Sequence, residues 1–165
     1  MKNLPKLVIP ILEKVRESKL TPSNLELEVW NYPNHQAWVD IFLELGIELF
    51  NSDLDASELP IGYKIVGFIF DWESQNQFDG WLALTNRANF IPEICHCYEL
   101  VGLPREAQSI RNAFDVWNSE INNYEEAAEA YSQGNPEYPD ELTRMENVVC
   151  YLIDNKEELF YENTA

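Results

Sequence analysis

Apolar residues recur at helical spacing along most of this chain, and the pattern is clearest over residues 34–50. One stripe in this segment consists of Trp38, Ile41, Phe42, Leu45 and Leu49. Asn34 stands just before the stripe and is a suitable N-cap for a helix. Alternation of the strand type is weak, and residues 25–30 are its best example. The pattern therefore predicts an all-α fold.

The same spacing continues after this segment. It predicts helices over residues 62–73, 91–101, 104–117, 121–132 and 140–161. A turn is expected at residues 77–79, directly before Gly80. We therefore expect a compact multi-helix single domain over residues 1–165.

The N-terminal residues 1–22 are expected to form a short helix or arm. Their apolar run, residues 7–12, contains Pro10 and is followed directly by charged residues. A signal peptide needs a longer apolar core than this run provides. No segment approaches the length of a membrane span, so the expected location is the cytoplasm.

The charge balance is the outstanding feature of the composition. The 165 residues include 29 Asp and Glu but only 11 Lys and Arg, which gives a net charge of −18. Residues 20–63 contain eight acids and no base, and residues 112–165 contain thirteen acids and two bases. Such a field repels nucleic acid and anionic membranes and attracts basic surfaces. The expected partner is therefore a basic protein, with no direct binding of nucleic acid or membrane.

Several acids stand in ordered positions on the predicted helices. Asp40, Glu44 and Glu48 follow at intervals of four residues, on a face away from the apolar stripe. Asp154, Glu158 and Glu162 repeat this spacing as a second row on the last predicted helix. Like charges at this spacing destabilise a helix by about 0.2–0.5 kcal/mol per pair, so helix stability does not explain them. The candidate partner-binding acids are Asp40, Glu44, Glu48, Asp53, Asp55, Glu125, Glu126, Glu129, Asp154, Glu158 and Glu162.

These rows admit two interpretations. They are either solvated faces that keep the protein dissolved, or imitations of a phosphate backbone. Row neighbours lie about 6 Å apart along a helix, whereas duplex DNA carries about one charge per 1.7 Å of its axis. A single row is too sparse to imitate DNA. Imitation therefore requires several acidic helices side by side, and a homodimer would extend such a surface.

Catalytic and metal-binding patterns are weak. Cys95 and Cys97 of the Cys-His-Cys triplet point about 200° apart on a helix, so they do not readily share one metal ion. His35 and Cys150 are the other histidine and cysteine. A Cys–His nucleophile would sit in an acidic field, which raises the pKa of a thiol. No enzyme activity, no cofactor and no metal is expected, and three cysteines favour a reducing compartment over a disulfide framework.

Two segments carry a resemblance to a known family. They are residues 71–81, with the sequence DWESQNQFDGW and followed by Leu84 and Asn86, and residues 97–104, with the sequence CYELVGLP and followed by Ala107 and Ile110. Together they resemble an all-helical bacterial family that contains a DNA-mimic protein of about this size. The resemblance covers residues 34–118. Relatives often have paired glycines where this chain has Asp79 before Gly80.

This resemblance implies a homodimer whose acidic surface occupies the DNA-binding site of a bacterial transcription factor and blocks operator binding. The family's shared motif does not carry the mimicking acids, so individual site residues do not transfer from it. An immunity-type protein that neutralises a basic toxin such as a nuclease would present the same surface chemistry. An enzyme with a concealed carboxylate site is the third hypothesis.

Overall fold

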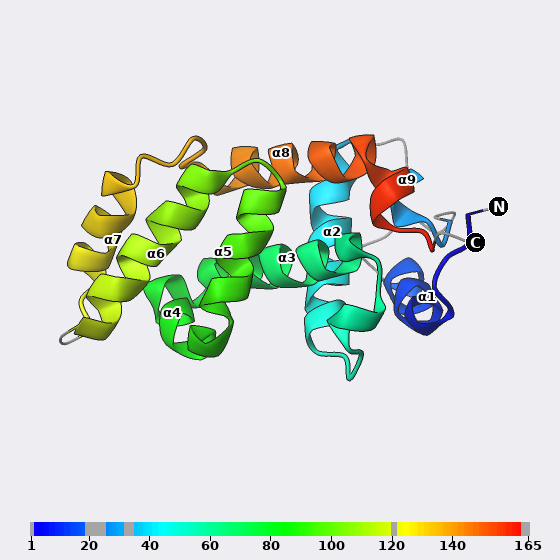
Figure 1. Ribbon diagram of the computed structural model, residues 1–165, viewed down its shortest axis with the longest axis horizontal. Coiled ribbons are helices and arrows are strands. Elements are labelled where there is room, and N and C mark those ends of the chain that lie inside the picture. Colours follow the sequence, from blue (N-terminus) through cyan, green and yellow to red (C-terminus); the bar gives the residue numbers. More distant parts are fainter. Residues whose placement is uncertain (1, 19–25, 32–34, 120–121, 163–165) are drawn as a thin grey trace. The chain divides into compact units, whose positions relative to one another are not determined.

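The computed structural model of the protein describes most of the chain. The described residues are 2–18, 26–31, 35–119 and 122–162. Their regular structure is helical, apart from an isolated antiparallel bridge between Asn3 and Glu162 (Figure 1). The predicted all-α, multi-helix class is confirmed. Among these residues no helix is both long enough and apolar enough to cross a membrane.

Contacts group the chain into two compact units, which the sequence did not predict. The first unit comprises Met1–Asp71 and Met145–Ala165, and the second comprises Trp72–Arg144. The boundaries fall within α3 (Ile61–Asp79) and α8 (Glu141–Asp154). Each unit is described by itself below.

The first unit combines short helical segments with longer helices. Besides its parts of α3 and α8, it comprises η1 (Lys6–Val8), α1 (Ile9–Glu17), η2 (Val29–Asn31), α2 (His35–Phe50), η3 (Ala56–Glu58) and α9 (Lys156–Leu159). The predicted apolar stripe of α2 is buried over its whole length. Phe42 of this stripe packs against Phe70 of α3, with ring centroids 5.6 Å apart, so the stripe faces the core.

An aromatic cluster joins the two chain segments of this unit. The ring of Phe160 stacks on Trp30 with centroids 4.2 Å apart, and Tyr63 meets it edge-on at 5.3 Å. The Tyr63 hydroxyl also donates a hydrogen bond of 3.0 Å to the Phe160 carbonyl. Phe160 is fully buried, so the C-terminal segment contributes directly to the core.

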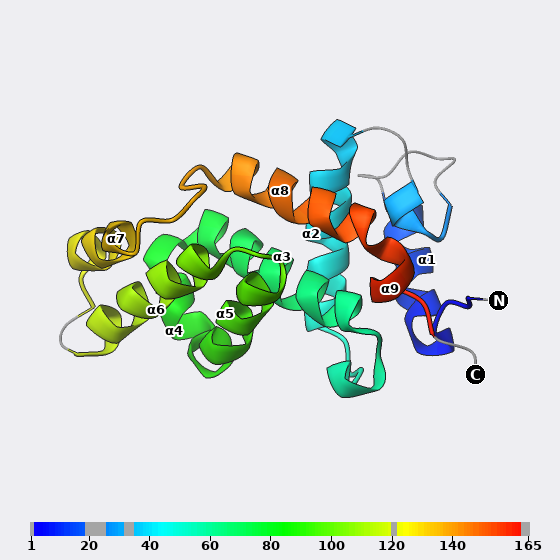
Figure 2. The same cartoon turned by 45° about the horizontal axis from the view of Figure 1, so that its top comes forward.

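The second unit is built from consecutive helices with short connections. It comprises the end of α3, η4 (Gly80–Leu82), α4 (Ala83–Asn86), η5 (Ala88–Phe90), α5 (Ile91–Leu100), α6 (Pro104–Ser119), α7 (Tyr124–Gln133) and the start of α8. Helices α5, α6 and α7 lie side by side and alternate in direction (Figures 1 and 2). Gly102, with φ of +81°, makes the tight turn between α5 and α6 that such alternation needs.

The structure corrects two predicted boundaries. The helix expected over residues 62–73 continues as α3 to Asp79, so the turn begins at Gly80, whose φ is +55°. The Gln75 side chain donates a hydrogen bond to the Asp79 carboxylate across one helical turn, which supports the extra length. Asn34, the proposed N-cap, lies outside the described residues.

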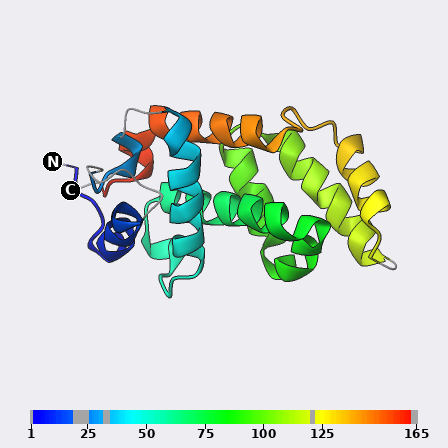
Figure 3. The ribbon, with the colours of Figure 1, turned by 180° about the vertical axis from the view of Figure 1, so that it is seen from behind.

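The last helix is also not continuous. The expected helix over residues 140–161 is divided into α8 and α9 at Asn155 (Figure 3). The Asn155 side chain donates a 2.8 Å hydrogen bond to the Tyr151 carbonyl, the acceptor that its own backbone N–H also uses. Such local side-chain bonds favour helix ends over helix interiors.

Gly46 lies where α2 and α3 approach each other closely, and this contact leads to a first testable prediction. A Cβ added at Gly46 would lie 2.5 Å from the Phe70 Cβ and 2.8 Å from the Val66 carbonyl oxygen. We expect Gly46→Ala to lower the free energy of unfolding by about 1–3 kcal/mol because the helices must separate. The measurement is urea unfolding followed by circular dichroism.

Gly67→Ala is the matched control in the same pair of helices. Its added Cβ would meet Leu49 Cβ at 3.5 Å, an ordinary contact. Alanine is favoured over glycine inside a helix by about 0.5–1 kcal/mol, so this variant should be neutral or more stable. Equal destabilisation by both substitutions would contradict the close approach at Gly46.

Candidate functional site

The predicted partner-binding acids differ in exposure. Nine of the eleven are exposed, namely Asp40, Asp53, Asp55, Glu125, Glu126, Glu129, Asp154, Glu158 and Glu162. Glu44 and Glu48 are half-buried. The surface is therefore rich in carboxylates, but the expected rows are not all solvated faces.

The acidic row on α2 is less exposed than its spacing in the sequence suggested. Glu48 forms an ion pair with Lys14 of α1, with 2.5 Å between Nζ and Oε2. The Oε2 atom of Glu44 is buried and has no hydrogen-bond partner among the described residues. Only Asp40 of this row is exposed. Only part of this row is therefore solvated, and the Lys14–Glu48 pair is a contact that periodicity within α2 does not show.

The row at the C-terminus is broken by the helix end at Asn155. Asp154 is the last residue of α8 and Glu158 belongs to α9. Glu162 follows α9, and its backbone N–H donates a 2.9 Å hydrogen bond to the Asn3 carbonyl. The three side chains are exposed, yet they do not lie at successive turns of one helix, as the sequence had suggested.

Asp53 and Asp55 lie between α2 and η3. Asp55 caps η3 by accepting hydrogen bonds from the Ser57 hydroxyl at 2.7 Å and from the Ser57 backbone N–H at 2.8 Å. These hydrogen bonds lower the pKa of Asp55 below its ordinary value. Asp55 therefore has a structural role, whereas Asp53 is exposed.

Helix α7 keeps its three predicted acids together on one exposed surface. Asn123 caps the helix through hydrogen bonds from the backbone N–H groups of Glu125 and Glu126. Ala127 and Ala130 are buried against the unit, which leaves Glu125, Glu126 and Glu129 outside. A shallow groove of about 240 Å³ is lined by Val116, Glu126, Glu129, Ala130 and Gln133.

The bases of the second unit are engaged elsewhere. Arg111 pairs with Glu99 at 2.7 Å, and Arg105 pairs with Glu137 at 3.7 Å. Arg87 is half-buried and donates a hydrogen bond to the Asn86 carbonyl. Helix α7 itself contains no base. Its carboxylates therefore face solvent without an intramolecular counter-ion among the described residues.

The fourth base, Arg144, is buried in an ion cluster that the sequence did not reveal. Its Nε and Nη2 atoms donate to the two carboxylate oxygens of Glu73 at 2.6 and 2.8 Å. Nη1 donates to the Tyr138 carbonyl at 2.9 Å. The Tyr98 hydroxyl donates to Glu73 at 2.5 Å. Buried charges require this degree of pairing to be tolerated.

Glu106 completes the cluster as a second carboxyl group. Its Oε1 lies 3.5 Å from Arg144 Nε, and its Oε2 accepts a 2.6 Å hydrogen bond from the Tyr131 hydroxyl. Burial raises the pKa of Glu106 to about 7, although Arg144 and the Tyr131 hydrogen bond act in the opposite direction. The cluster thus holds one guanidinium, one carboxylate and one carboxyl group that titrates near neutrality.

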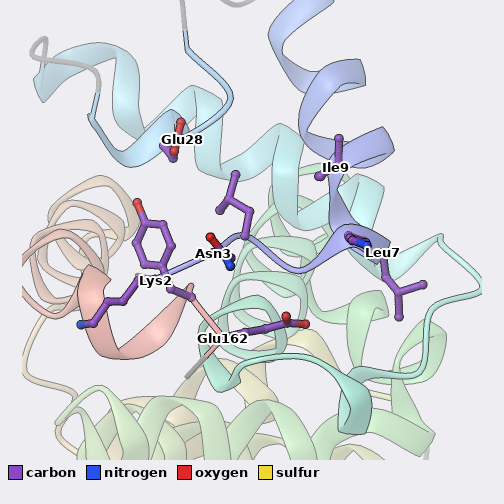
Figure 4. A pocket seen from close by; sticks show the side chains of 9 residues that line it. Lys2, Asn3, Leu7, Ile9, Glu28 and Glu162 are labelled. Carbon is purple, nitrogen blue, oxygen red and sulfur yellow. The ribbon is translucent and has the colours of Figure 1, made fainter. Parts of the chain in front are cut away.

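A larger, open hollow lies in the first unit (Figure 4). Its volume is about 550 Å³, and it is lined by Lys2, Asn3, Leu4, Lys6, Leu7, Ile9, Glu28, Tyr161 and Glu162. Charges of both signs line it, and the Lys2 ammonium is engaged by the Glu157 carbonyl at 2.8 Å. These residues include no pairing of a nucleophile with a base, so the hollow suggests no reaction.

In the described part of the chain, the three cysteines and His96 belong to no group that could hold a metal ion. Cys95 and Cys97 are buried, whereas Cys150 is exposed. Burial raises the pKa of the Cys95 thiol to about 12. Within the described ranges no three His, Cys, Asp or Glu residues are placed to hold a metal ion. The side chain of His35 lies outside the described residues.

Comparisons with protein-family models, with curated proteins and with solved structures found no match to the chain. The resemblance to the DNA-mimic family therefore stays a prediction. The fold and surface define an all-α protein with a buried ion cluster in its second unit and with exposed carboxylates on α7 that have no ion-pair partner among the described residues.

The ion cluster predicts that the stability of the fold depends strongly on the balance of charges within the cluster. We expect Arg144→Leu to lower the free energy of unfolding by about 3–5 kcal/mol, because it leaves the Glu73 carboxylate buried without its partner. The double variant Arg144→Leu/Glu73→Leu should lose less than the single one, since neither charge remains. Urea unfolding of both variants measures the difference, and a larger loss in the double variant would contradict the pairing.

The raised pKa of Glu106 predicts that the stability of the fold depends on pH. Its pKa rises from an ordinary value near 4.5 in the unfolded chain to about 7 in the fold, so the folded state holds the proton more tightly. The stability that this proton contributes is present below pH about 4.5 and is lost as the pH rises through about 7.

The test compares the wild type with Glu106→Gln from pH about 5 to 8. We expect the wild type to lose up to about 3 kcal/mol of unfolding free energy relative to this variant over that range. Glu129→Gln, at an exposed position, is the control and should follow the wild type. Parallel curves for wild type and Glu106→Gln would contradict the raised pKa.

Proposed function

We propose that this protein is a DNA mimic whose acidic surface binds the DNA-binding site of a basic transcription factor or repressor and blocks operator binding. The observation that carries the proposal is the surface of α7. Glu125, Glu126 and Glu129 are exposed together, and the bases of the same unit are engaged elsewhere. Carboxylates without counter-ions are available to a cationic partner.

The distribution of charge over the two units supports the same proposal. The first unit contains sixteen acids and seven bases, and the second contains thirteen acids and four bases. Each unit therefore carries a net charge of −9 on its own. An acidic surface of this kind attracts DNA-binding proteins by the same long-range field that DNA uses.

Imitation of the charge density of DNA still requires more than one helix. Glu125 and Glu129 are one turn apart, or about 6 Å along the axis, which is sparser than phosphates on either DNA strand. Exposed acids from other elements, and a homodimer, would supply the remaining charge. Self-association is accordingly part of the proposal.

The experiment uses the immobilised full-length protein and extract from its native source. We expect proteins retained at about 50 mM NaCl to include DNA-binding proteins that duplex DNA elutes. The purified candidate should then release its operator in a gel-shift assay when this protein is added. Retention of a nuclease whose activity is inhibited would favour the toxin-neutralising alternative. Retained proteins that duplex DNA does not elute would contradict mimicry.

Charge-neutral variants test which surface is used. We expect Glu125→Gln/Glu126→Gln/Glu129→Gln to weaken operator displacement by about tenfold at low salt, with a smaller difference as salt rises. Glu13→Gln/Glu17→Gln/Glu26→Gln changes the net charge equally at exposed positions outside the predicted set. Equal weakening by both variants would show that net charge, and not α7, determines binding.

A further inference from the structure

Three exposed apolar residues gather around the turn at Gly80. Phe78 at the end of α3 is 84% exposed, Tyr124 at the start of α7 is 51% exposed and Leu82 of η4 is 41% exposed. We call these three residues the Phe78 patch. Among the large apolar side chains that are exposed in the described residues, Phe78 has the highest exposure.

The turn at Gly80 and the start of α7 are held against each other. The Tyr124 Cε1 atom lies 3.3 Å from the position that a Cβ on Gly80 would take. The Tyr124 hydroxyl donates to the Asp79 carbonyl at 3.3 Å, and Trp81 packs on the ring of Tyr131 with centroids 5.3 Å apart. Two contacts along α7 therefore fix the turn beside this helix.

Folding does not account for the exposure of Phe78. Its neighbours in α3 divide into buried residues such as Trp72 and polar residues such as Gln77 at the exposed positions. A phenylalanine with most of its ring in water contributes little to the core, and a polar residue would serve the helix equally well. Phe78 is not isolated, because Tyr124 and Leu82 are exposed at the same turn, and grouped exposed apolar side chains mark interaction sites.

The charge beside the patch selects its occupant. Glu125 and Glu126 follow Tyr124 directly on α7, and both are exposed. Arg87 is the base nearest in sequence to the Phe78 patch. It is half-buried and donates a hydrogen bond to the Asn86 carbonyl. A second copy seated on the patch would bring its own Glu125 and Glu126 near these carboxylates, which is unfavourable. A basic partner would gain from the same carboxylates.

We propose that the Phe78 patch is a docking surface for a basic protein segment that also presents an apolar side chain. This inference rests on the proposed function, from which it takes the basic partner. The carboxylates of α7 supply the part of the affinity that salt weakens. Burial of Phe78 supplies a part of the affinity that salt does not weaken.

The experiment titrates three synthetic peptides of equal length into the full-length protein by calorimetry. One alternates lysine and leucine on a helical pattern, one replaces leucine by serine, and one replaces lysine by glutamate. The proteins are the wild type, Phe78→Ser and the matched control Leu142→Ser. Leu142 is 52% exposed in the second unit but does not belong to the patch.

At about 300 mM NaCl we expect the wild type to bind the lysine–leucine peptide about fivefold more tightly than the lysine–serine peptide. Phe78→Ser should remove most of this difference, whereas Leu142→Ser should keep it. The glutamate–leucine peptide should not bind. Sedimentation of wild type and Phe78→Ser should give the same molecular mass.

Other outcomes overturn the proposal in distinguishable ways. Equal binding by Phe78→Ser and wild type would exclude the docking surface and leave the proposed function standing. Binding of the glutamate–leucine peptide would exclude a basic partner at the patch. A dimer that Phe78→Ser dissociates would assign the patch to self-association. Failure of both lysine peptides to bind even at about 50 mM NaCl would count against the proposed function as well.

Discussion

Arg144 carries a full positive charge into the interior of the second unit, where water cannot solvate it. Its guanidinium meets Glu73 from α3 and Glu106 from α6, while Tyr131 from α7 hydrogen-bonds to Glu106. Leaving any of these groups unpaired would be expensive in free energy. The helices of the unit must therefore stay in positions that satisfy all of them, and the position of α7 depends on this constraint.

The same cluster affects the surface. Of the four bases of the second unit, Arg144 is buried in the cluster. Arg105 pairs with Glu137, and Arg111 pairs with Glu99. The carboxylates on α7 consequently have no intramolecular counter-ion in the described part of the chain. Burial of Arg144 in the cluster therefore leaves one base fewer to neutralise the proposed partner surface.

Helical periodicity predicted the fold class and most helices because the apolar stripes are long and regular. The stripe on α2 is buried as expected, and α5, α6 and α7 appear close to their predicted ranges. Glu73 and Arg144 could not be predicted as a pair, since 71 positions separate them. A weak signal existed: Arg144 is one of only two bases in residues 112–165, where an isolated base has many potential partners.

The sequence by itself determined the acidity, the all-α class and the lack of a recognisable catalytic motif, because these depend on composition and on local spacing. Only the tertiary structure decided which acids are free. Glu48 forms an ion pair with Lys14 of α1, and Asp55 caps η3, so neither carboxylate is fully free. The acids of α7 stayed exposed. Exposure and pairing depend on contacts between distant segments, which periodicity within one helix does not report.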